Sequence, residues 1–167
     1  MNAIFYLAAI VAIFSTFMVI TRSNAIHALL YLIVSLLAVA IIFYLLGAPF
    51  AAALEVIIYA GAIIVLFVFA VMVLNPDPKE TSWIFAWSQP SLWLGPVVLT
   101  IILGVEFLYV FLLSGGDQLD IAGISPKMVG LSLYGPYLLG VEFASMLLLA
   151  GLVGAYHLGH RPDRKGE

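Results

Sequence analysis

Residues 54–67 read LEVIIYAGAIIVLF and place one glutamate, Glu55, inside an otherwise apolar run. The run belongs to a longer segment, 50–74, in which Glu55 is the only charged residue. Because an α-helix rises ~1.5 Å per residue, this segment is long enough to cross a bilayer. A carboxylate there costs about 2.5–3.5 kcal/mol on insertion scales. The stretch therefore predicts a transmembrane helix whose glutamate needs either a polar partner or a function.

The composition indicates an integral membrane protein. The chain has 167 residues, of which 65% are hydrophobic and 9% are charged, whereas soluble domains are roughly one quarter charged. It contains no cysteine, which excludes disulfides, thiolate metal sites and iron–sulfur ligation. We find no phosphate-binding glycine loop, and six basic residues are too few for a nucleic-acid surface. We therefore expect no catalytic residue, no metal site and no nucleic-acid partner.

Five apolar stretches predict an all-α fold with five transmembrane helices in a single domain, residues 1–167. The approximate spans are 3–21, 26–46, 50–74, 92–113 and 134–157. Prolines agree with these limits, since Pro49 precedes the third span and Pro136 opens the fifth. Ser125-Pro126 predicts a short surface helix between the last two spans.

The basic residues predict the orientation of these helices. With the N-terminus outside (periplasmic) and the C-terminus cytoplasmic, only Lys127 lies on the outer side. The inner side then holds Arg22, Lys79, Arg161, Arg164 and Lys165, as the positive-inside rule requires. Trp83, Trp87 and Trp93 would form an aromatic belt at the inner interface.

Three glutamates, Glu55, Glu106 and Glu142, fall within spans, in the outer half of the bilayer at similar depth. They form either a group of proton-carrying sites or separate acids that each hydrogen-bond a neighbouring helix. On an α-helix Tyr59, four residues after Glu55, shares its face, and beyond Tyr59 about 22 Å of apolar surface extends to Leu74. This pattern indicates a gate or one wall of a proton path rather than a complete channel.

Small residues follow the tyrosine in Ala60-Gly61-Ala62. They favour either close packing against another helix or a backbone irregularity such as a π-bulge, which occurs at functional sites. Two other classes of function remain open: His27 and His157 could ligate a haem from two helices, and a small independent carrier is conceivable.

Three blocks of the chain resemble a known family. EVIIYAGAIIVLFVFAVMVLN (Glu55 to Asn75) is similar to the third helix of the J subunit of bacterial respiratory NADH:quinone oxidoreductase, complex I. The mitochondrial counterpart is NADH dehydrogenase subunit six. NAIHALLYLIVSLL (Asn24 to Leu37) resembles its second helix, and YGPYLLGVEFASMLLLAGLV (Tyr134 to Val153) resembles its fifth. The similarity runs from about Phe5 to Tyr156.

The resemblance implies a core membrane-arm subunit of a proton-pumping NADH:quinone oxidoreductase. It implies a π-bulge around YAGAI, whose switching makes or breaks a water path between the quinone region and the pumps. The matching gate positions are Tyr59, Gly61, Ile63, Val65, Leu66 and Phe67, with Glu55 at the outer end of the helix. Glu142 is a further candidate for the proton path on the cost of its burial alone. Glu106 matches no motif of the family.

The resemblance also implies partners and a location. The partners are the quinone-site subunit, the small K subunit, the antiporter-like subunits and the lipid of a bacterial inner (plasma) membrane, which the chain crosses several times. It implies a non-catalytic subunit with no active site and no cofactor of its own; FMN, iron–sulfur clusters and quinone belong to the assembled complex. The alternatives are a related subunit of a membrane hydrogenase or of a multisubunit cation/proton antiporter, or a purely structural subunit.

Overall fold

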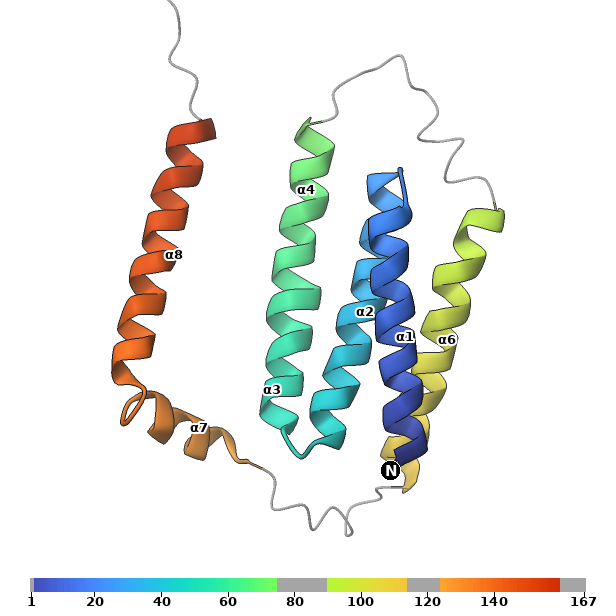
Figure 1. The fold of residues 1–167 in the computed structure, drawn as a ribbon, viewed down its shortest axis with the longest axis horizontal. Coiled ribbons are helices and arrows are strands. Elements are labelled where there is room, and N and C mark those ends of the chain that lie inside the picture. The colour runs from blue at the N-terminus through green and yellow to red at the C-terminus, as the bar shows by residue number, and fades with distance from the viewer. Residues whose placement is uncertain (1, 75–89, 114–123, 160–167) are drawn as a thin grey trace, which may run out of the picture. The chain divides into compact units, whose positions relative to one another are not determined.

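The computed structural model describes residues 2–74, 90–113 and 124–159, and every regular element in these ranges is a helix (Figure 1). Five helices are long and apolar enough to span a membrane: Ala3–Thr21, Ala25–Leu45, Pro49–Val71, Trp93–Val110 and Leu138–Gly159. The five predicted spans are thus confirmed, whereas the orientation stays a prediction. Several residues that the orientation rests on lie outside the described ranges: Trp83, Trp87, Lys79, Arg161, Arg164 and Lys165.

The chain forms two compact units, 1–124 and 125–167, which we describe separately. The first unit contains α1 (Asn2–Thr21), α2 (Ala25–Leu45), a composite third helix and α6 (Pro90–Leu113). Within this unit α2 is central, because it packs against α1, all parts of the third helix and α6 (Figure 1). The predicted single domain is not tested by this division and stays a prediction.

Local signals in the sequence set both ends of α2. Asn24 caps its start, where the side-chain oxygen accepts hydrogen bonds from the backbone N–H groups of Ile26 (2.9 Å) and His27 (3.4 Å). Gly47 ends it in the left-handed region, at φ 80°, a conformation that costs glycine little. The Gly47 carbonyl also accepts the N–H of Ile124 at 3.3 Å, which ties the end of the first unit to this turn.

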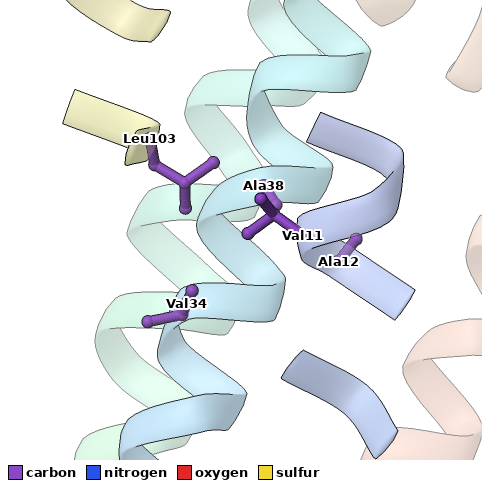
Figure 2. Packing of buried hydrophobic residues seen from close by; sticks show 5 residues of the cluster. All are labelled: Val11, Ala12, Val34, Ala38 and Leu103. Atoms are coloured by element: carbon purple, nitrogen blue, oxygen red, sulfur yellow. The ribbon is translucent and has the colours of Figure 1, made fainter. Parts of the chain in front are cut away.

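The core of the first unit lies where α1, α2 and α6 meet. Its buried members are Val11, Ala12, Val34, Ala38 and Leu103 (Figure 2). A small polar cluster adjoins it, in which the hydroxyl oxygens of Thr16 and Ser35 are 2.8 Å apart and Ser35 donates to the Ala12 carbonyl at 3.2 Å. Such bonds between membrane helices contribute about 0.6 kcal/mol each on average. They link α1 to α2 at a fixed register.

The second unit consists of α7 (Pro126–Leu133) and α8 (Leu138–Gly159). The predicted short helix is confirmed, since Ser125 caps α7 by accepting the Met128 N–H at 3.3 Å. The predicted start of the fifth span at Tyr134 is four residues early. A turn occupies residues 134–137, in which the Tyr137 N–H bonds back to the Ser132 carbonyl at 3.1 Å.

Candidate functional site: a π-helical segment in the third span

The third span is one continuous helix with a change of winding in the middle. It runs as α3 (Pro49–Leu54), a π-helical segment η1 (Glu55–Ile63) and α4 (Ile64–Leu74). At its entrance the Glu55 N–H bonds back four residues, to the Ala51 carbonyl. At its exit the Ile64 N–H bonds back five residues, to the Tyr59 carbonyl. The resemblance implied a π-bulge around YAGAI, and the structure confirms it.

Gly61 lies inside the π-helical segment, near its end. A Cβ atom at this position would lie 3.2 Å from the Val56 carbonyl oxygen, five residues back. That contact is closer than most side chains tolerate, so the carbonyl would have to shift by a few tenths of an ångström. The glycine therefore suits the π-helical form, in which the residue five positions back lies directly beneath it.

The π winding changes which residues share a face. Glu55 and Tyr59 were expected on one face, but Glu55 is buried at 8% exposure whereas Tyr59 is 51% exposed. Four residues make about one turn of either winding, so the shared face of Glu55 and Tyr59 stays a prediction. The residue whose position the winding does change is Ile64, nine residues from Glu55, which is buried at 3% exposure.

The other predicted gate residues lie mostly on the outer surface of the first unit. Val65, Leu66 and Phe67 are exposed, and Gly61 and Ile63 are half-buried. The described residues of the first unit therefore do not enclose a path lined by these side chains. Their side chains are available to lipid or to other subunits.

The three membrane glutamates have different surroundings. Glu55 and Glu106 are buried within the first unit, whereas Glu142 is exposed on α8 in the second. The Ser145 hydroxyl near Glu142 donates to its backbone carbonyl at 2.8 Å and not to its carboxylate. The predicted grouping of the three acids stays a prediction, because Glu142 belongs to the other compact unit.

An apolar cavity of about 530 Å³ lies between α2, the start of the third helix and α6. Val56, the neighbour of Glu55, lines one wall, and Phe107, the neighbour of Glu106, lines another. The elements that carry the two buried acids therefore line the same cavity.

One tight contact was missed by the sequence reasoning. Tyr31 of α2 is buried, the Arg22 guanidinium lies 5.6 Å from its ring centroid, and a Cβ at Gly95 would collide with the Tyr31 hydroxyl. Gly95 therefore permits the close approach of α6 to α2. The pair Gly95-Pro96 near the start of a span was the only local signal, and it does not identify the partner.

Comparison with known proteins places the chain. It is 55% identical over 166 residues to NADH-quinone oxidoreductase subunit J of Pseudomonas aeruginosa, covering 99% of both chains. It is 52% identical to the subunit J of Escherichia coli, covering 100% of this chain and 90% of that one. A third relative, from Buchnera aphidicola, is 46% identical over 159 residues. The profile of NADH-ubiquinone/plastoquinone oxidoreductase chain 6 matches residues 15–158, and the chain belongs to this family.

Proposed function

We propose that this chain, a membrane subunit of an NADH-quinone oxidoreductase by its family, helps couple quinone reduction to proton translocation through a switchable third helix. The observation that carries the proposal is the π-helical segment Glu55–Ile63, which begins at a buried glutamate inside a membrane span. An alternative place in a hydrogenase or an antiporter is not favoured, since the relatives named above are quinone oxidoreductase subunits.

The geometry supports a rotary switch. If η1 adopted α-helical winding, nine residues from Glu55 would make two and a half turns, and Ile64 would lie about half a turn away from its present side. The residues of α4 would rotate with it, so that Val65, Leu66 and Phe67 present different surfaces to the neighbouring subunits. In this proposal these three residues form a dry barrier, which rotation opens to water.

Glu55 is the proposed protonatable group at the start of the switch. Glu55 is buried, and its neighbour Val56 lines the apolar cavity. Tyr59 is half exposed, so in this proposal it relays hydrogen bonds to groups of other subunits. Gly61 permits both windings, and Ile63 lies at the junction with α4.

The surroundings of the chain are also part of the proposal. The chain would cross a bacterial inner membrane with its N-terminus in the periplasm and would contact the quinone-site, K and antiporter-like subunits. FMN, iron–sulfur clusters and quinone would lie in the other subunits. Glu142 would meet a polar group of a partner, because an exposed carboxylate in a membrane span requires one.

Replacing Glu55 by Gln in the intact complex tests the assignment. Gln keeps the size of the side chain and removes the exchangeable acid, so the ratio of protons pumped to NADH oxidised should fall. Glu55→Asp keeps the acid and serves as the matched control. An undiminished ratio in Glu55→Gln would exclude Glu55 from the mechanism.

A further inference from the structure

Glu106 is a buried acid that the proposed switch does not use. It lies in α6 between Leu103, one turn before it, and Val110, one turn after it, and all three side chains are buried on one face. Leu103 reaches from α6 to Val34 and Ala38 of α2 in the core (Figure 2). Glu106 is 6% exposed, and neither carboxylate oxygen has a hydrogen-bond partner among the described residues.

Among the described residues of the first unit, the helices that pack most against α6 bring no cation near this carboxyl group. The helices that pack against α6 are α1 and α2, and the only basic side chain that they contain is His27. Since α2 and α6 run in the same direction (Figure 1), Glu106 lies beyond Leu103 on the side away from His27. Val34 is seven residues from His27, so the separation along the axis exceeds about 10 Å.

The remaining titratable groups of these helices also offer no compensation. They are phenols, which are uncharged donors or acceptors: Tyr6, Tyr31, Tyr44 and Tyr109. Glu55, which lies next to another wall of the cavity, has the same sign as Glu106. A buried carboxylate with neither a cation nor a hydrogen bond is strongly disfavoured, and binding one proton removes its charge.

We propose that Glu106 is a proton-binding site within the membrane, distinct from Glu55 and independent of the switch in the third helix. Binding adds one proton to one carboxylate oxygen, RCOO⁻ + H⁺ → RCOOH, and no other bond forms or breaks. The ligand is the proton rather than a metal cation, because a sodium ion needs several oxygen ligands, whereas the described residues provide no hydrogen-bond partner for either carboxylate oxygen of Glu106.

Infrared difference spectroscopy of the intact, purified complex tests the proposal. The wild-type minus Glu106→Gln spectrum should contain one carboxylic-acid carbonyl band that moves to lower frequency in D₂O. Glu80→Gln, outside the spans, provides the control and should remove carboxylate bands instead. Loss of carboxylate bands in Glu106→Gln would show an ionised side chain and overturn the proposal.

Two further measurements separate the remaining explanations. Addition of sodium chloride should leave the acid band unchanged; its conversion to a carboxylate band would identify a sodium site and contradict proton binding. If Glu106→Gln fails to assemble, Glu106→Asp should shift the band rather than abolish it.

Discussion

Glu55 and Ile64 lie nine residues apart and occupy the same buried side of one helix, at 8% and 3% exposure. Nine residues of α-helix make two and a half turns, which would place the two side chains on opposite faces. The i→i+5 bonding of the intervening segment makes the same nine residues about two turns. The winding between Glu55 and Ile64 therefore decides which face of α4 meets α2, and the first prediction follows from this.

Substitution of Gly61 should shift the helix away from the π form. A Cβ atom crowds the Val56 carbonyl at 3.2 Å in the present winding, whereas α-helical winding moves that carbonyl away. Crowding on the order of 1 kcal/mol changes the ratio of two conformers about fivefold. Protons pumped per NADH should fall from wild type through Gly61→Ala to Gly61→Val.

The matched control for Gly61 is Gly104, at which a Cβ atom would meet nothing within 4 Å apart from the backbone of its own helix turn. Gly104→Ala gains the same helix propensity, about 1 kcal/mol, without crowding a carbonyl. Its pumping ratio should equal that of the wild type. Equal losses in both series would assign the effect to helix propensity and not to the π winding.

Gly95 should not tolerate a side chain, because Tyr31 occupies the space beside it. The Cβ of Gly95→Ala would collide with the Tyr31 hydroxyl, and such overpacking typically costs about 1–3 kcal/mol. The amount of chain in the membrane, followed by pulse-chase, should decrease several-fold. Tyr31→Phe removes the hydroxyl, so the double variant should recover most of the loss. No recovery would show that Tyr31 is not what Gly95 accommodates.

Two buried serines should respond in opposite directions to the same substitution. Ser35 bonds Thr16 and the Ala12 carbonyl, so Ser35→Ala should destabilise the chain by about 0.5–1.5 kcal/mol. The Ser15 hydroxyl is fully buried and has no partner among the described residues. Ser15→Ala should therefore be neutral or stabilising. Pulse-chase half-lives in membranes measure both, and a loss of similar size at Ser15 would contradict the hydrogen-bond assignments.

The spans could be predicted from the sequence because membrane insertion depends on local hydropathy. The cap at Ser125 was predictable because it too is a local signal: a capping residue bonds the next turn of its own helix. The start of α8 was misplaced because Pro136 is tolerated in the turn before a helix as well as in its first turn. Local rules therefore locate elements better than they locate their ends.

The site was only partly predictable. The cost of burying a charge identified Glu55 and Glu106, and both are buried, but nothing in the residues alone distinguished a π-bulge from close packing at Gly61. The assumed α-helical period then missed Ile64, which is buried like Glu55. The contact of Gly95 with Tyr31 joins residues from two helices, so a pattern within either one does not reveal it.

The most direct test of the switch is a pair of cryo-electron microscopy structures of the intact complex, one at rest and one during turnover with NADH and quinone. The account predicts π winding over Glu55–Ile63 in one state and α-helical winding in the other, with Ile64 rotated by about half a turn relative to Glu55. The same π winding in both states, with Ile64 unmoved, would contradict it.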